Sequence, residues 1–177
     1  MLRTPLLLLA LALLASTASA KVFYAKDEAL HLAFPDADKI EARDFFLTPE
    51  QRTAIEERAK SKLDSDLLTV YVGQRDGAVQ GYAMLDTHTV RTLPETFLVV
   101  VSPQGTVAAT HLLAFYEPLE YSPPVRWLEQ FHDATLSDDL RVGRGIVAIT
   151  GSTLTSEAVT GGVRRALAIY DVLLKGK

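Results

Sequence analysis

The stretch that decides the fold class runs from Leu67 to Leu85 and reads LLTVYVGQ, then RDG, then AVQGYAML. Both outer segments are rich in the aliphatic, β-branched and aromatic residues that favour strands. The Asp76-Gly77 pair between them favours a tight turn, because both residues tolerate a positive φ. These features predict a β-hairpin with strands over 67–74 and 78–85.

A second hairpin is predicted directly after the first. Apolar segments cover residues 96–101 and 106–115, and the residues SPQG between them are typical of a turn. Two consecutive hairpins favour a four-stranded, mainly antiparallel sheet, since a hairpin joins neighbouring antiparallel strands.

Predicted helices flank the hairpins in the sequence. One covers residues 25–34 and ends before a proline, and a short one covers 123–132. The tetrapeptide TPEQ that begins at Thr48 combines an N-cap, a proline at the first helical position and a capping-box glutamine, so a helix is predicted from there to about Leu63. This order predicts an α+β fold, with a mainly antiparallel sheet built from two hairpins and flanked by helices.

A longer helix is predicted at the C-terminal end. Apolar residues recur there at steps of three and four, as on the buried face of an amphipathic helix. The apolar stripe consists of Val159, Val163, Ala166, Leu167, Tyr170, Leu173 and Leu174, and the charged residues Arg164, Arg165, Asp171 and Lys175 fall outside it. We therefore expect a helix that reaches about Leu174 and packs on the sheet through this stripe.

The segment just before this helix is rich in hydroxyl groups. Residues 150–156 read TGSTLTS, and five of these seven side chains carry a hydroxyl. A helix N-terminus presents unpaired N–H groups and the positive end of the helix dipole, so it favours a phosphate group. On the residues alone, the segment is either such an anion site or a simple cap in which Thr153 or Thr155 begins the helix.

The same segment resembles the flavinylation motif of the FMN-binding domain family. The run TGSTLTSEAV over 150–159 is similar to the family pattern, usually Ser/Thr-Gly-Ala-Thr-x-Thr/Ser-Ser, and weaker similarity extends over 81–131. The family includes the C subunit of the sodium-pumping NADH:quinone oxidoreductase and the G subunit of the Rnf complex. In this family, the threonine that closes the first four residues carries FMN through a phosphoester bond, which a dedicated flavin transferase installs from FAD.

The resemblance implies which residues hold FMN in this chain. Thr153 is the position that carries the cofactor, and the rest of the cofactor-binding loop is Thr150, Gly151, Ser152, Leu154 and Thr155. Glu117 is a further candidate, because Glu117-Pro118 resembles a Glu-Thr-Pro segment near the flavin, although the threonine is absent. Its alternative role is to end a strand. The chain departs from the motif at Ser152, where alanine is usual, and at Val147, where many members have an aspartate.

The N-terminal residues predict export. Arg3 precedes an uninterrupted apolar run over 6–15, and small residues follow that end in Ala18-Ser19-Ala20, as in a secretory signal peptide. A membrane-spanning helix needs about 20 apolar residues, roughly twice the length of this run. We expect residues 1–20 to be a signal peptide and residues 21–177 to form a single FMN-binding domain, periplasmic or otherwise exported.

Composition narrows the range of functions. The chain has no cysteine, which excludes disulfides and thiolate metal sites, and His111 has no companion at metal-ligand spacing. A formal net charge of −4 argues against nucleic acid as a partner. No Ser-His-Asp, paired-carboxylate or Walker-type motif indicates hydrolysis or phosphoryl transfer.

Two further groups of residues each have two interpretations. Asp86, His88 and Arg91 follow the second predicted strand, where they either face a ligand from a loop or are solvated loop residues. Tyr121 and Trp127 either flank an isoalloxazine ring or belong to the core.

Two functions are consistent with these features. The first is a redox carrier rather than a stand-alone enzyme, namely an exported flavoprotein that carries electrons on FMN attached to Thr153. Such a carrier needs a flavin transferase for its maturation and a redox partner, and the resemblance allows a membrane-bound one. The second is a sensor or adaptor module that binds FMN or another phosphorylated ligand without a covalent bond.

We expect the exported protein to begin at Lys21, because the small residues Ala18 and Ala20 suit signal peptidase. N-terminal sequencing of the exported protein measures this directly. An intact Met1 would refute cleavage and indicate a membrane anchor instead.

Overall fold

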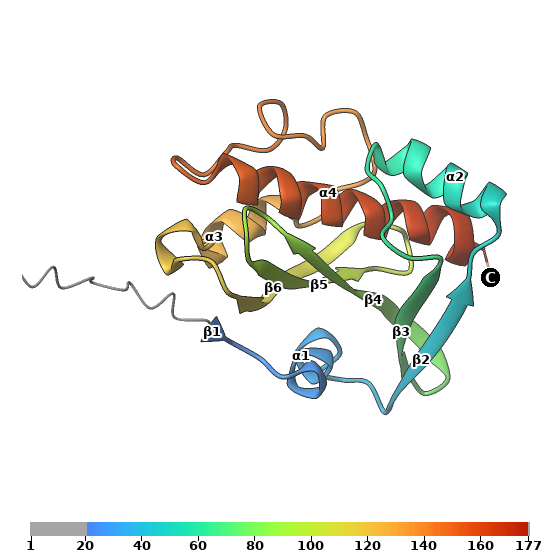
Figure 1. The fold of residues 1–177 in the computed structure, drawn as a ribbon. Helices are drawn as coiled ribbons and strands as arrows, with labels where there is room; N and C mark the ends of the chain where they lie inside the picture. The colour runs from blue at the N-terminus through green and yellow to red at the C-terminus, as the bar shows by residue number, and fades with distance from the viewer. Residues whose placement is uncertain (1–20, 177) are drawn as a thin grey trace, which may run out of the picture.

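The structure is a computed structural model that describes residues 21–176, so the predicted signal peptide lies outside the described residues. The chain forms a six-stranded antiparallel sheet with helices on both faces (Figure 1). The strands are β1 (Lys21–Val22), β2 (Lys39–Phe46), β3 (Leu67–Arg75), β4 (Ala78–Thr89), β5 (Pro94–Val101) and β6 (Val107–Phe115). The helices are α1 (Lys26–Ala33), α2 (Pro49–Ala59), α3 (Val125–Leu128) and α4 (Thr153–Ile169). The predicted α+β fold and C-terminal helix are confirmed.

Both predicted hairpins are present. β3 and β4 are joined by Asp76 and Gly77, whose φ values of 50° and 78° are those of a type I′ turn. β5 and β6 pair antiparallel across residues 102–106. The strand order in the sheet is β1-β6-β5-β4-β3-β2, so the two hairpins form its centre.

The sheet is wider than the four strands that the sequence predicts. β2 pairs with β3 at one edge, and β1 pairs with β6 at the other. β2 reads KIEARDFF, and all its side chains are exposed or half-buried, so it lacks the apolar run by which the other strands are recognised. β1 has only two residues, too few for any periodic pattern.

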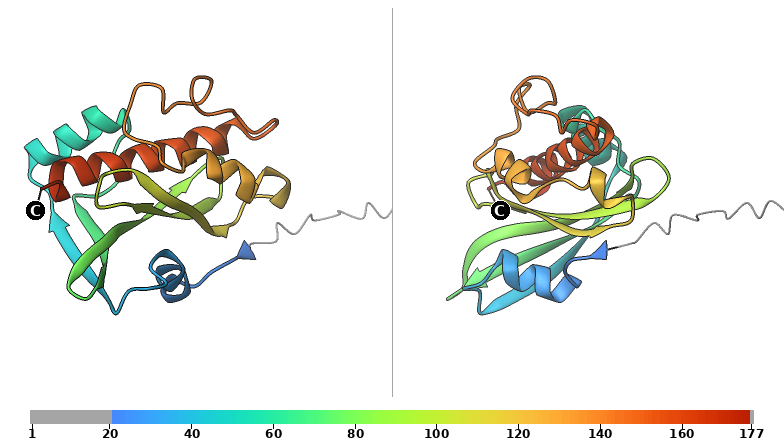
Figure 2. Two further views of the ribbon diagram at one scale, coloured as in Figure 1. Left: turned by 180° about the vertical axis from the view of Figure 1, so that it is seen from behind. Right: turned by 90° about the vertical axis from the view of Figure 1, so that its left-hand side faces the viewer.

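The two faces of the sheet are covered by different helices (Figure 2). α2, α3 and α4 lie over one face, and α1 lies over the other. Along β5, Phe97 and Val99 face the α4 side, whereas Leu98 and Val100 face α1. Because both faces are buried, β5 has a continuous apolar sequence rather than an alternating one.

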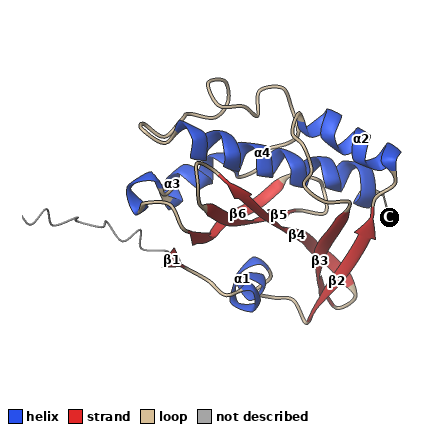
Figure 3. Ribbon diagram, viewed as in Figure 1, coloured by secondary structure: helices blue, strands red, loops and turns tan. Residues whose placement is uncertain are grey.

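α4 packs on the sheet as the sequence predicts. Val159, Val163, Leu167 and Tyr170 are at most 5% exposed. A π-helical turn, Tyr170–Leu174, continues the helix to the predicted end. A long loop after α3 crosses the side of α4 that faces away from the sheet (Figure 3).

α2 is shorter than predicted. Thr48 caps its start, since the Thr48 Oγ1 accepts a hydrogen bond from the Gln51 N–H at 3.3 Å. The helix ends at Ala59 and not near Leu63, because Lys60 adopts a left-handed conformation with φ 53°. The Leu63 N–H then donates to the Glu56 carboxylate at 3.0 Å, so a side chain replaces the helical carbonyl as its acceptor.

Within residues 21–176, no helix combines the length and the apolar character that crossing a membrane requires.

Two adjacent glycines in the middle of α4 have different surroundings. A Cβ atom on Gly162 would lie 3.0 Å from the Asp86 carboxylate, which is too close, whereas one on Gly161 would lie 3.4 Å from Arg165 Nη1, an ordinary van der Waals contact. Asp86 is held by the Arg165 guanidinium and by His88, so it has little freedom to move away. Gly162 is therefore the glycine that the packing requires.

We expect Gly162→Ala to lower the free energy of unfolding by about 1–2 kcal/mol, because the clash outweighs the gain in helix propensity. Gly161→Ala is the matched control and should raise it by up to about 1 kcal/mol. Chemical denaturation of both variants tests this. Equal stabilisation by the two substitutions would contradict the assigned contact.

Candidate functional site

The hydroxyl-rich segment leads directly into α4, as predicted. Gly151 adopts φ +80°, a left-handed conformation that suits glycine, and the helix begins at Thr153. The N-cap residue is Ser152, but its side chain makes no capping hydrogen bond. The simple-cap interpretation, in which Thr153 or Thr155 begins the helix as its cap, is therefore wrong.

Ser156 holds the segment in place. Its hydroxyl donates to the Ser152 carbonyl at 3.0 Å and accepts a hydrogen bond from the Ile149 N–H at 2.9 Å. The Ser152 N–H also donates to the Ile149 carbonyl at 3.0 Å. Because Ser156 is fully buried, these bonds fix the loop from inside.

The predicted cofactor-binding residues divide into an exposed and a buried set. Thr150, Gly151, Thr153 and Leu154 are exposed, whereas Ser152 and Thr155 are each only 2% exposed. The two threonines at the helix start therefore differ in access. Thr153 offers its hydroxyl to solvent, and Thr155 does not.

The first turn of α4 also carries free hydrogen-bond donors. The first intrahelical bond runs from the Ser156 N–H to the Ser152 carbonyl at 3.0 Å. Among the described residues, the N–H groups of Thr153, Leu154 and Thr155 have no acceptor, and the buried Ser152 hydroxyl has no partner. Such a helix start suits an anion.

Trp127 anchors the preceding loop rather than presenting its ring to a ligand. Its indole N–H donates to the Val147 carbonyl at 2.6 Å, and its ring packs edge-on against Phe131 with centroids 5.3 Å apart. Val147 is anchored a second time, because its N–H donates to the Gln130 side chain at 3.0 Å. Trp127 is 8% exposed, which agrees with the core interpretation.

Glu117 shapes the turn between β4 and β5. One carboxylate oxygen accepts hydrogen bonds from the N–H groups of Arg91, Thr92 and Leu93 at 3.3, 2.9 and 2.9 Å. These backbone bonds lower the pKa of Glu117. The guanidinium of Arg91 lies over the ring of Tyr121, 4.3 Å from its centroid. Arg91 and Tyr121 are thus in contact with each other.

Asp86 and His88 lie in β4 and not in a loop, because this strand continues to Thr89 beyond its predicted end. Both loop interpretations are therefore wrong for these two residues. His88 bridges two carboxylates, with its ring nitrogens 2.7 Å from Asp86 and 2.6 Å from Glu95. Asp86 in turn forms two hydrogen bonds with the Arg165 guanidinium, at 2.7 and 2.8 Å.

This buried charge cluster, Asp86, His88, Glu95 and Arg165, was not predicted from the sequence. The sequence does contain one indication of it: Asp86 and His88 are two residues apart, so a strand places both side chains on the same face. Glu95 is completely buried, and one of its oxygens has no partner within the described residues, so burial raises its pKa. The pKa of Asp86 is lowered despite its burial, because His88 and Arg165 favour the carboxylate.

Comparison with known proteins agrees with the resemblance found in the sequence. No protein-family model matches the chain. The chain is similar to the G subunit of the Na(+)-translocating ferredoxin:NAD(+) oxidoreductase complex of Acetobacterium woodii, with 32% identity over 127 residues. The alignment covers 62% of this chain and 58% of the relative, so the chain spans less than two thirds of that protein. The predicted resemblance to this G subunit is confirmed.

A solved structure was also found by comparison. It is the crystal structure of Shewanella oneidensis NqrC, with a TM-score of 0.49 and 16% sequence identity. The match covers 75% of this chain and 78% of that one.

The charge cluster makes stability depend on pH. Burial alone lowers the pKa of His88, but the hydrogen bonds and charges of Asp86 and Glu95 outweigh it and raise the pKa from 6.5 to about 9. Protonated His88 therefore contributes stability that is fully present below pH 6.5 and is lost as the pH rises through 9.

We expect the free energy of unfolding to fall by on the order of 2–3 kcal/mol between pH 6.5 and 9. Urea denaturation across this range measures the fall, and His88→Gln serves as the reference because it cannot titrate. A parent protein and a His88→Gln variant with the same pH dependence would show that His88 stays neutral.

Proposed function

We propose that this chain is an exported flavoprotein that carries electrons on FMN, held by a phosphoester bond to Thr153. The observation that carries the proposal is the exposed Thr153 hydroxyl at the first position of α4, beside N–H groups without acceptors. A separate flavin transferase installs the cofactor, because the attachment loop resembles a substrate motif and not a catalytic one.

The residues at the helix start fit a phosphate diester. Thr153 supplies the oxygen that is esterified, and the N–H groups of Thr153, Leu154 and Thr155 are the donors available to phosphate oxygens. The positive end of the α4 dipole favours the remaining negative charge. The buried Ser152 hydroxyl, which has no partner among residues 21–176, is a further donor beside the loop.

FMN supplies the redox chemistry when bound, while the chain attaches and orients it. The anchors inside the loop, Ser156 and Trp127, restrict the movement of the attachment residue. A rigid attachment matters because electron transfer depends on a constant distance to the partner. A covalent bond also keeps the cofactor from being lost by dilution outside the cytoplasm.

The similarity to the G subunit of the Acetobacterium woodii complex supports electron transfer within or beside a membrane complex. The chain spans 58% of that relative, so the proposal extends to an electron carrier with a membrane-bound redox partner and not to sodium translocation.

The second candidate is a sensor or adaptor that binds FMN or another phosphorylated ligand without a covalent bond. Val147 favours it, because this residue stands where many members of the resembled family have an aspartate. Its side chain is 71% exposed, in the loop that precedes the attachment residue. A flavin transferase would meet this position directly.

We expect Thr153→Ala to abolish covalent labelling when the chain is co-expressed with a flavin transferase, because alanine has no oxygen to esterify. The parent protein should gain a mass on the order of 400 Da that survives denaturation. Thr155→Ala is the matched control: its hydroxyl is buried, so the label should be retained with a stability loss of about 1–2 kcal/mol.

Intact mass spectrometry and in-gel flavin fluorescence provide the measurements. A label that persists in Thr153→Ala would move the attachment to another residue. An unlabelled parent that becomes labelled on Val147→Asp would identify the missing aspartate as the obstacle. If neither protein is labelled by an active transferase, the non-covalent module is the better description.

A further inference from the structure

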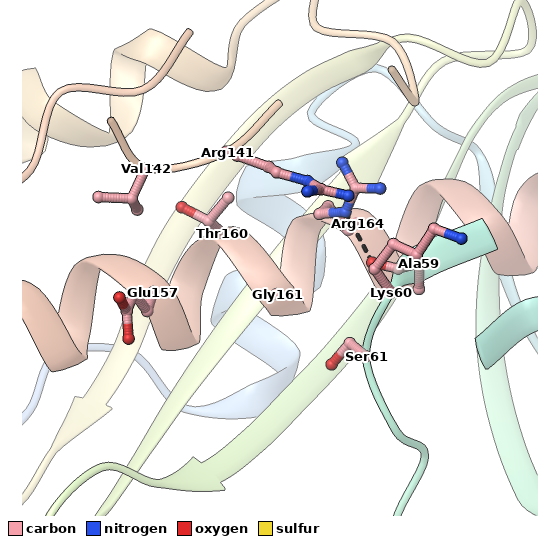
Figure 4. Close-up of a pocket in the computed structure, with 9 residues that line it drawn as sticks. All are labelled: Ala59, Lys60, Ser61, Arg141, Val142, Glu157, Thr160, Gly161 and Arg164. Carbon is pink, nitrogen blue, oxygen red and sulfur yellow. Dashed lines mark hydrogen bonds between the residues drawn. The ribbon is translucent and has the colours of Figure 1, made fainter. Parts of the chain in front are cut away.

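A groove of about 440 Å³ lies between the end of α2, the middle of α4 and the loop that crosses α4 (Figure 4). Its lining residues are Ala59, Lys60, Ser61, Arg141, Val142, Glu157, Thr160, Gly161 and Arg164. Figure 4 shows Glu157 at one end and the three basic side chains toward the other. The groove is large enough for a nucleotide-sized ligand.

Arg164 is a buried cation with unusual partners. It is 5% exposed, and its guanidinium donates to the carbonyls of Ala59 and Ser137, both at 2.6 Å, and of Arg58 and Leu140, both at 3.1 Å. No carboxylate in the described part of the chain lies within salt-bridge distance of it. Its hydrogen bonds are satisfied, but its charge is not neutralised, which is rare for a buried arginine.

The basic end of the groove contains two further cations. Burial lowers the pKa of Arg164, and repulsion by Arg141 lowers it further, while the charge of Asp138 acts in the opposite direction. The carboxylate that faces Arg141, Asp138, is 3.7 Å away and 81% exposed, so solvent weakens this pair. Lys60 forms no salt bridge within residues 21–176. Three positive charges therefore lie together at one end of the groove. The one carboxylate that lines it, Glu157, is at the opposite end.

We propose that this groove binds an anion of the phosphate class, either free or as part of a nucleotide. The Arg141 guanidinium and the Lys60 ammonium offer donors to phosphate oxygens. Arg164, whose donors are taken by carbonyls, contributes its positive charge, which an anion in the groove would balance. Ser61 and Thr160 line the same groove. The Thr160 hydroxyl donates to the Ser156 carbonyl at 2.6 Å, whereas the Ser61 hydroxyl accepts from Arg165 and keeps its own proton for an anion.

The groove opens on the same face of α4 as Thr153. Thr153, Glu157 and Arg164 follow one another at spacings of four and seven residues, which places them on one side of a helix. Arg164 lies about 16 Å along the helix axis from Thr153. Glu157, at the other end of the groove, lies only about 6 Å along the axis from Thr153. The basic end is therefore the part that is remote from the attachment residue, and the proposal does not rest on covalent flavin binding.

The test is a titration of ¹⁵N-labelled protein with pyrophosphate, AMP and adenosine, at constant ionic strength set with sodium chloride. We expect saturable shifts of the Ser61, Thr160 and Gly161 amide signals with pyrophosphate and AMP, and none with adenosine. Tighter binding of AMP than of pyrophosphate identifies a nucleotide ligand, and the reverse identifies a free phosphate anion. Absence of saturation, or equal binding of adenosine, would overturn the proposal.

The variants compare two arginines of the same loop. Arg141→Gln should weaken binding at least tenfold, whereas Arg144→Gln, which lies outside the groove, should leave the affinity within twofold of the parent. Arg164 itself is not substituted, because it joins α2 to the loop and its loss would unfold that region. If both variants weaken binding equally, the anion is attracted by the overall positive charge of the loop and not by the groove, and the proposal is wrong.

Discussion

Asp86 accepts two hydrogen bonds from the Arg165 guanidinium, at 2.7 and 2.8 Å, where Gly162 allows α4 to come close to β4. His88 and Glu95 complete this cluster below the helix. A shift of α4 by one residue would leave these buried charges without partners, at a cost of several kcal/mol. The cluster thus sets the position of α4 on the sheet. Because α4 is a rigid helix, this also sets the position of Thr153, its first residue.

Arg164, the residue before Arg165, makes its contacts on the other side of α4. Successive residues of an α-helix point about 100° apart, so Arg164 reaches α2 and the crossing loop while Arg165 reaches the sheet. The two differ in how their charge is balanced. Arg165 meets a carboxylate, whereas Arg164 meets only carbonyl groups, so positive charge remains in the groove beside it. Arg164 and Arg165 therefore connect α4 to α2, to the crossing loop and to the sheet, and Arg164 adds its charge to the basic groove.

At the start of α4, the helix geometry places some of the hydroxyl-bearing residues in the core and others in solvent. Ser152, Thr155 and Ser156 turn toward the core, while Thr153 and Leu154 face solvent. The inward hydroxyl of Ser156 fixes the loop, and the outward hydroxyl of Thr153 stays available for chemistry. The rigidity of the loop and the accessibility of its exposed threonine therefore come from hydroxyl-bearing residues three positions apart.

By itself, the sequence determined the two hairpins, the amphipathic face of α4 and the hydroxyl-rich run before it, because turn chemistry, apolar spacing and helix starts are local properties. The edge strand β2 escaped prediction, since pairing with β3, and not its own polar sequence, makes it a strand. Likewise, only the tertiary structure ended α2 at Lys60 and placed Asp86 and His88 in β4. It also decided which threonine is exposed and which arginine lacks a carboxylate. Burial and charge pairing depend on residues far apart in the chain, and no local pattern records them.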